Sequence, residues 1–172
     1  MSDEDFLALG ASERVELFDG ALWIRRVGAP RHQHIAGCLV DLLRAEGVHV
    51  LRAVHVRLKP ARILIPDVVI ASEVDFDEPA VAGDSVLLVG EVVTTCGASV
   101  TKVLKMQYYA EAGIPWCLLI DHGTGALHLH ELDGGHYVQR SVTTVGEVLH
   151  LTDPVDATIS PERLLPPPAV HR

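Results

Sequence analysis

Two short, almost wholly apolar runs, at residues 63–71 and 86–93, stand out from the alternating polar and apolar positions of the chain. Both are short and rich in Val and Ile, a pattern that favours buried strands over helices. Each contains one carboxylate, Asp67 in the first run and Glu91 in the second. A lone carboxylate in a buried strand is costly unless a cation, backbone N–H groups or a metal ion compensates it. Two such residues together indicate a shared metal ion.

The segment before these runs combines a hairpin with a helix. Residues 15–24 predict the hairpin, because Asp19 and Gly20 at its centre tolerate the positive φ angles of a type I′ turn. Apolar residues then recur at helical spacing through residues 33–46, which predicts an amphipathic helix that ends at Gly47.

The sequence patterns of the remaining segments around the two runs predict a strand, a loop and a second helix. Residues 48–58 alternate with a period of two and predict one half-exposed strand. Residues 72–84 are acidic, contain Pro and Gly, and predict a loop. Residues 98–112 predict a second helix, which Gly113 and Pro115 terminate.

The second half of the chain adds more strands. Three strand-like runs, separated by Gly-rich turns, predict an antiparallel meander at residues 116–121, 126–132 and 137–142. The expected fold class is therefore α/β (α+β), with a mixed central β-sheet flanked by helices and the meander appended to it. We expect one domain at residues 1–165 and a flexible, Pro-rich tail at residues 166–172.

Composition narrows the possible functions. The chain has 172 residues, of which 48% are hydrophobic, and a formal net charge of −9, so it can bury one core but cannot coat nucleic acid by bulk electrostatics. A local basic groove remains compatible with that charge. The N-terminus lacks the pattern of a secretion signal, and no apolar run approaches the ~20 residues of a membrane span, so we expect a cytoplasmic protein. The three cysteines, Cys38, Cys96 and Cys117, have neither disulfide nor zinc spacing.

The two carboxylates can converge if their strands are neighbours, because side chains alternate along a strand. Asp67 and Glu91 would then repel each other unless a cation lies between them, and Mg²⁺ prefers such oxygen ligands. A helix that follows the second strand packs back across the sheet and can bring Lys102 or Lys105 to the same edge. The alternative for Asp67 is a structural role, in which it caps a turn or pairs with an arginine.

Histidines and aromatic residues offer a competing interpretation. Two His-x-His pairs could bind Zn²⁺ if a third ligand joined them, namely His32 with His34 and His128 with His130. We interpret the second pair as a solvent-facing strand edge, and His34 as a helix-start residue close to the active cleft or a cap. Four aromatic residues are too scattered for a base-stacking platform and are interpreted as core: Trp23, Trp116, Tyr108 and Tyr109.

The ordered set of motifs resembles a known family. The set consists of Pro66-Asp67, Glu91, a lysine on the next helix and the sequence YAEAGIPWCLLID at residues 109–121. Upstream, ELFDGAL at residues 16–22 is similar to the opening of the same family. Over residues 15–142 the chain resembles the bacterial restriction-endonuclease-like proteins of the PD-(D/E)XK nuclease superfamily.

The resemblance implies a function for specific residues. Asp67 and Glu91 would bind Mg²⁺ or Mn²⁺, with the backbone carbonyl of Val92 as a third ligand. Glu16 would contribute through the outer shell of the site. The lysine that the superfamily usually carries two residues after the glutamate is displaced to the following helix in this branch, where Lys105 takes that place.

Two departures from the family pattern leave two functions open. Val93 occupies the usual lysine position, and Thr101 stands where the branch often has an acidic residue. The first function is a metal-dependent endonuclease that hydrolyses DNA phosphodiester bonds. The alternative is a catalytically weakened relative that acts as a binding or regulatory module. In either case relatives of this type are commonly dimers, and exposed strand edges in the C-terminal half predict a homodimer.

Overall fold

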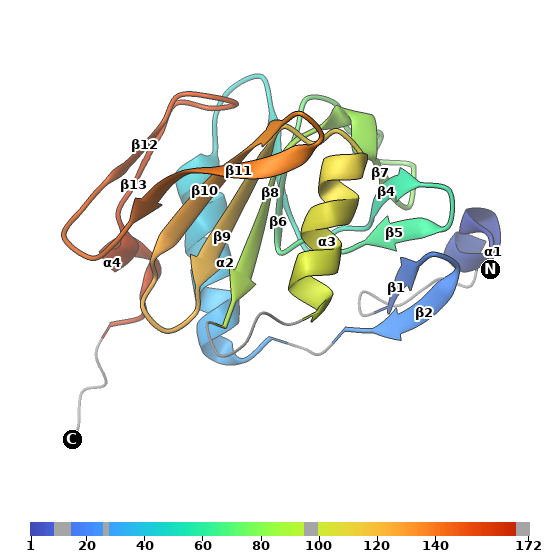
Figure 1. The fold of residues 1–172 in the computed structure, drawn as a ribbon, viewed down its shortest axis with the longest axis horizontal. Coiled ribbons are helices and arrows are strands. Elements are labelled where there is room, and N and C mark those ends of the chain that lie inside the picture. The colour runs from blue at the N-terminus through green and yellow to red at the C-terminus, as the bar shows by residue number, and fades with distance from the viewer. Residues whose placement is uncertain (9–14, 26–27, 95–99, 168–172) are drawn as a thin grey trace.

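The chain is organised around a six-stranded sheet (Figure 1). The structure is a computed structural model that describes residues 1–8, 15–25, 28–94 and 100–167. The strand order is β11-β10-β9-β8-β6-β3, in which β8 and β9 are parallel and all other neighbours antiparallel. These strands are β3 (His49–Arg52), β6 (Val68–Ala71), β8 (Val86–Val93), β9 (Trp116–Asp121), β10 (Leu127–Asp133) and β11 (His136–Thr143). The predicted mixed sheet and its meander, β9 to β11, are confirmed.

A second sheet has five strands in the order β2-β1-β5-β4-β7, and two further strands form a separate hairpin. The bounds are β1 (Val15–Phe18), β2 (Ala21–Ile24), β4 (Val56–Lys59), β5 (Arg62–Leu64), β7 (Val81–Ala82), β12 (Leu149–Leu151) and β13 (Ala157–Ile159). The predicted hairpin is β1–β2, and its turn residues Asp19 and Gly20 have φ angles of 47° and 82°. The loop predicted at residues 72–84 contains β7, which leads through the 3-10 turn η1 (Gly83–Ser85) into β8.

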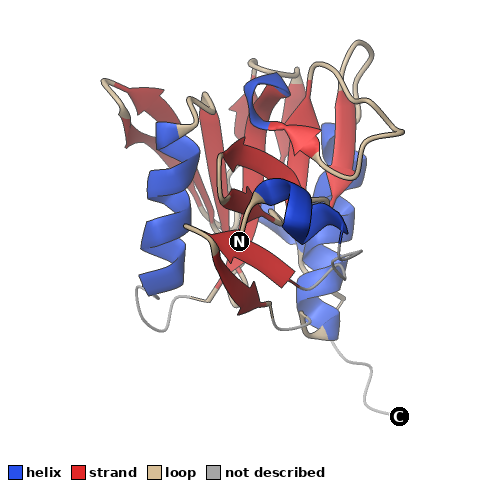
Figure 2. Cartoon of the chain, turned by 90° about the vertical axis from the view of Figure 1, so that its right-hand side faces the viewer, coloured by secondary structure: helices blue, strands red, loops and turns tan. Residues whose placement is uncertain are grey.

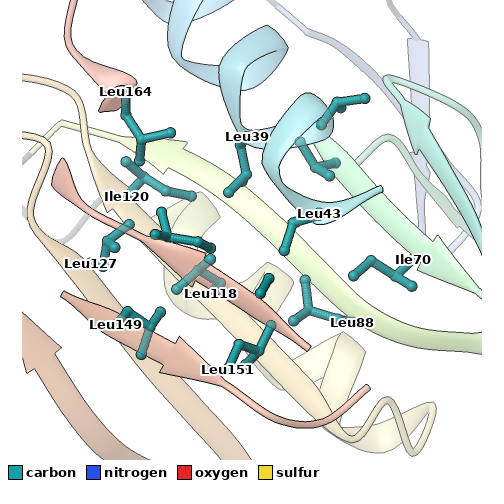
Figure 3. Close-up of a cluster of buried hydrophobic side chains, with 14 of the residues drawn as sticks. Leu39, Leu43, Ile70, Leu88, Leu118, Ile120, Leu127, Leu149, Leu151 and Leu164 are labelled. Carbon is teal, nitrogen blue, oxygen red and sulfur yellow. The ribbon is translucent and has the colours of Figure 1, made fainter. Parts of the chain in front are cut away.

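Helices and the smaller sheets cover both faces of the six-stranded sheet (Figure 2). On one face lie α2 (Pro30–Leu43), α4 (Pro161–Leu164) and the β12–β13 hairpin; Figure 3 shows Leu39 and Leu43 of α2 in this core. On the other face lie α3 (Val100–Glu111) and the five-stranded sheet, which α1 (Asp3–Ala8) contacts through Phe6. Because the sheet is buried on both sides, its central strands are continuous apolar runs rather than alternating ones.

The helix predicted at residues 33–46 is α2, which begins and ends three residues earlier. Pro30 lies in its first turn, where backbone N–H groups have no acceptor within the helix, so the proline costs no helical hydrogen bond. Arg44 is already extended, with φ −62° and ψ 125°. Gly47, with φ 81°, therefore lies in the following turn and does not cap the helix.

The single strand predicted at residues 48–58 is wrong. The segment forms β3 and β4, which belong to different sheets and are separated by Ala53 with a φ of 51°. A period of two continues through such a break, because extended chain on either side keeps the same alternation.

The apolar run at residues 63–71 is divided in the same way. β5 pairs with β1 and β4, whereas β6 pairs with β3 and β8, so residues 65–67 cross from one sheet to the other. Pro66 has no N–H group to donate to a strand partner at this crossing. Asp67 therefore lies between two strands rather than inside one, whereas Glu91 lies inside β8 as predicted.

Other predictions concern the C-terminal tail, the start of the second helix, the cysteines and membrane-spanning segments. Residues 168–172 of the predicted tail, residues 98–99 of the predicted second helix and Cys96 lie outside the described residues. Cys117 is buried and Cys38 partly buried, both as free thiols. Within the described ranges, no helix combines the length and apolar character needed to cross a membrane.

Candidate active site

A cleft of about 500 Å³ lies where the β1–β2 hairpin, the sheet crossing, β8, α3 and the first turn of α2 meet. Its lining includes three carboxylates and three basic side chains, namely Glu16, Asp67, Glu91, Arg25, Lys102 and Lys105. Their charges balance, although the chain as a whole has a net charge of −9. A larger cleft of about 650 Å³ beside β4 and β7 has a mostly acidic ionisable lining and contains none of the predicted site residues.

The sheet crossing places Asp67 beside Glu91. Val68 pairs with Gly90 in the antiparallel β6–β8 register, and one further step along that register sets Asp67 opposite Glu91. Opposite residues of an antiparallel pair point to the same face. The side chain of Asp67 is only 3% exposed, and its Oδ2 accepts a hydrogen bond from the Val92 N–H at 2.8 Å.

Two further side chains contact Asp67. Arg25, which directly follows β2, forms an ion pair with Oδ1 through Nη2. His32, in the first turn of α2, places Nε2 3.0 Å from Oδ2. The pairing of Asp67 with an arginine, left open as an alternative by the sequence, is thus present in the structure.

Lys105 joins the other two carboxylates of the cleft. Its Nζ lies 2.6 Å from Oε1 of Glu16 and 3.4 Å from Oε1 of Glu91. All three residues are at most 9% exposed. Glu16 also accepts a hydrogen bond from the Ile65 N–H at 2.8 Å, so it connects Lys105 to the sheet crossing. Because the three charges are buried together, each depends on the others for compensation.

Tyr109 supplies an additional donor to this group. It lies on α3 one turn after Lys105, and its hydroxyl donates a hydrogen bond to Oε1 of Glu91 at 2.5 Å. Burial, and then the negative charge of Glu91, raise the pKa of Tyr109 well above its usual range. The hydroxyl therefore stays protonated at neutral pH and remains a donor. Tyr109 is fully buried, as predicted for a core residue, but it also belongs to the site.

His32 is held in its position by close packing. Burial lowers its pKa below the ordinary value, and the charge of Arg25 lowers it further, whereas Glu91 acts in the opposite direction. The imidazole is thus neutral at neutral pH and can donate from Nε2 to Asp67. A Cβ atom at Gly28 would lie 2.4 Å from Nδ1 of His32, so only glycine fits beside this ring.

The structure brings together all four side chains proposed from the sequence, namely Glu16, Asp67, Glu91 and Lys105, and adds Arg25 and His32, which were not in that set. Arg25 carries no pattern that distinguishes it from the other arginines. His32 was considered only as one half of a His-x-His pair. Its partner His34, which we expected close to the cleft or as a cap, is exposed and contacts Cys38. Lys102 also lines the cleft, yet the ion pairs with Glu16 and Glu91 belong to Lys105.

The donor set fits a hard divalent cation. Asp67 and Glu91 provide carboxylate oxygens on one face of the cleft, which is the ligand chemistry of Mg²⁺ and Mn²⁺. The Val93 carbonyl accepts a hydrogen bond from His122 on the β9 side, so the Val92 carbonyl, one residue earlier in the strand, points to the Asp67 side. Among the described residues no group of three or more His, Cys, Asp or Glu side chains is arranged to hold a metal. The expected set contains only two such side chains and a carbonyl.

The family model and the fold together support the restriction-endonuclease-like class of the PD-(D/E)XK superfamily for this chain. The Uma2 family, described as putative restriction endonuclease, matches residues 3–162, and the chain belongs to that family. The predicted resemblance is therefore confirmed. A solved structure of a putative nuclease belonging to DUF820 from Anabaena variabilis ATCC 29413 has a similar fold, with a TM-score of 0.71 over 95% of this chain and 97% of that chain at 11% identity. No curated protein matches the chain.

Proposed function

We propose that the chain is a Mg²⁺- or Mn²⁺-dependent endonuclease that hydrolyses DNA phosphodiester bonds. The observation that carries this proposal is the convergence of Asp67, Glu91 and Lys105, from three separate segments, in one cleft of about 500 Å³. Membership of a family described as putative restriction endonuclease supports the same chemistry. The balanced charge of the cleft also supports it, because the net charge of −9 would otherwise repel a polyanion.

The position of each side chain in the cleft indicates a separate role in the proposed reaction. Asp67, Glu91 and the Val92 carbonyl would hold the cation, which supplies an activated water and offsets charge on the scissile phosphate. Lys105 lies 3.4 Å from Glu91 and is placed to stabilise negative charge that develops on the phosphate oxygens. Glu16 orients Lys105 through the 2.6 Å ion pair.

The first prediction tests the wild-type protein. Calorimetric titration with Mg²⁺ or Mn²⁺ is expected to show saturable binding at millimolar concentration or below, because two buried carboxylates face one cleft. Under the same conditions, end-labelled single- and double-stranded DNA should be cut, and excess chelator should stop the reaction. Absence of both binding and cleavage would exclude the endonuclease.

One specific observation favours the second candidate, a non-catalytic binding or regulatory module. Both carboxylates that are predicted to bind the metal already have a cationic partner, since Asp67 pairs with Arg25 and Glu91 with Lys105. A site that is electrostatically satisfied by its own side chains resists cation entry. If divalent ions do not bind while DNA binds without being cut, this second candidate is the better account.

The second prediction concerns assembly, and we propose a homodimer formed through the C-terminal half. β11 is an edge strand of the six-stranded sheet. Three valines on and after it are 44%, 59% and 44% exposed, namely Val142, Val145 and Val148. An exposed edge next to apolar side chains is a surface that a second copy can cover.

The dimer is tested by light scattering at micromolar concentration. We expect twice the monomer mass for the wild type and the monomer mass when the three valines are replaced by serine. Val103→Ser is a matched control, because Val103 is 57% exposed but lies on α3. A wild-type monomer, or a triple variant that remains dimeric, would refute the proposed interface.

A further inference from the structure

Strand β2 exposes large apolar side chains at the entrance of the cleft. β2 is the edge strand of the five-stranded sheet, and all four of its residues are exposed. Trp23 is 44% exposed and Ile24 is 83% exposed. The interpretation of Trp23 as a core residue is therefore wrong. Large apolar side chains that stay exposed next to a polar site are typical of a ligand-binding surface.

Trp23 faces the site rather than the opposite side of the hairpin. It pairs directly with Glu16 in the β1–β2 register, and residues opposite one another share a face. Glu16 contacts Lys105 at 2.6 Å, so this face is the one that carries the catalytic candidates. Accordingly, Trp23 lines the same cleft as Asp67 and Glu91. Ile24, the last residue of β2, also belongs to the lining of this cleft.

The indole of Trp23 is supported but not enclosed. Its ring centroid lies 5.1 Å from that of Phe18, with a tilt of 44° between the planes. Phe18 is only 4% exposed and contacts Tyr108 in turn, with 5.8 Å between the centroids. An aromatic residue that is 44% exposed and packs against another ring is a suitable stacking partner for a nucleobase.

The size of the cleft narrows the choice of ligand. A cavity of about 500 Å³ is in the range that encloses one small-molecule-sized group, so it suits a single nucleotide better than a base-paired segment. Arg25 and Lys102 line the same cleft as Trp23 and would place positive charge near the phosphate of a bound nucleotide. In a duplex the bases are already stacked on each other and present no free face to a protein ring.

We propose that Trp23, flanked by Ile24, stacks on an unpaired nucleobase next to the phosphate held in the cleft. The substrate class is then single-stranded DNA, or duplex DNA with an unpaired or flipped-out nucleotide. This inference rests on the proposed endonuclease function and specifies its substrate. The competing occupant of β2 is the edge strand of a second copy of the chain.

The experiment uses the fluorescence of Trp23. The chain has two tryptophans, Trp23 and Trp116, so the Trp116→Phe variant reports on Trp23 alone. A single-stranded oligothymidylate of about ten nucleotides is titrated in with Ca²⁺, which replaces Mg²⁺ in order to prevent cleavage. We expect saturable quenching with this oligonucleotide and none with an abasic oligonucleotide of the same length, because the latter keeps the phosphates but lacks the bases.

A second measurement quantifies the contribution of the ring in the full-length protein. Trp23→Ala should weaken binding of the oligothymidylate by roughly five- to a hundredfold, the range that corresponds to the loss of one base–aromatic stack. Trp23→Phe should recover part of the affinity. Phe76→Ala is the matched control, because Phe76 is 72% exposed but does not line the cleft.

The outcomes separate this inference from the proposed function. Equal quenching by the abasic oligonucleotide, or unchanged affinity of Trp23→Ala in a protein that cuts DNA, would overturn the stacking role and leave the endonuclease intact. Loss of dimer mass in Trp23→Ala, with unchanged DNA affinity, would assign β2 to a second copy instead. A wild type that neither binds nor cuts DNA would remove the proposed function and this inference together.

Discussion

Asp67→Asn and Glu91→Gln are each expected to lower DNA cleavage by about a hundredfold or more and to abolish the calorimetric signal of Mg²⁺ binding. Both substitutions keep the size of the side chain and remove its negative charge. The amide that Asp67→Asn introduces is a poor ligand for a hard cation, although its oxygen can still accept from the Val92 N–H. The amide oxygen in Glu91→Gln can likewise still accept the hydrogen bond of Tyr109. The loss therefore reports on charge rather than on packing.

Two exposed residues provide matched controls for this pair. Asp41→Asn lies on α2 at a side chain that is 76% exposed, and Glu46→Gln lies in the exposed turn after that helix. Both should cut DNA and bind Mg²⁺ like the wild type. Circular dichroism should show the wild-type melting temperature for the two control variants and a folded spectrum at the assay temperature for Asp67→Asn and Glu91→Gln. Wild-type cleavage by either Asp67→Asn or Glu91→Gln would exclude that carboxylate as a metal ligand.

The parts of the fold that the sequence could predict are those in which local pattern and tertiary environment agree. β8 is a continuous apolar run because both faces of its sheet are covered, and its single carboxylate, Glu91, stood out for that reason. The β1–β2 hairpin was equally clear, because Asp19 and Gly20 adopt the positive φ angles that the turn requires.

Other features depend on where the chain changes sheets, which periodicity does not reveal. Residues 48–58 and 63–71 keep an extended pattern while they leave one sheet and enter the other. Asp67 lies at the second of these crossings, so its neighbours are decided by the meeting of distant segments. Arg25 and His32 reach it from the end of a hairpin and from the start of a helix, and no spacing along the chain connects the three.

The sequence pattern also could not decide which of the two candidate lysines belongs to the site. Lys102 and Lys105 are three residues apart on α3, and residues at this spacing lie on neighbouring parts of a helix surface. The structure separates them, because Lys105 is 8% exposed and contacts two carboxylates. That contact also changes the expected consequence of removing Lys105, since the side chain now has a structural role as well as a proposed chemical one.

Lys105→Met is expected to lower the free energy of unfolding by about 3–5 kcal/mol, the typical cost of leaving buried charges without their partner. Methionine fills a similar volume, so little of the loss comes from a cavity. Glu16 and Glu91 would remain buried at 3% and 9% exposure without the ammonium group between them. For comparison, a native domain has a total stability of only about 5–15 kcal/mol.

Urea denaturation followed by circular dichroism measures this loss, with Lys59→Met as the control. Lys59 is exposed, so its replacement should change the free energy by no more than about 0.5 kcal/mol. The double variant Glu16→Gln with Lys105→Met should recover part of the stability, because it removes one of the two carboxylates that the lysine had compensated. If Lys105→Met is as stable as Lys59→Met, the buried ion pairs of Lys105 do not hold this site together. Any effect of Lys105→Met on DNA cleavage would then come from the loss of the positive charge and not from a loss of stability.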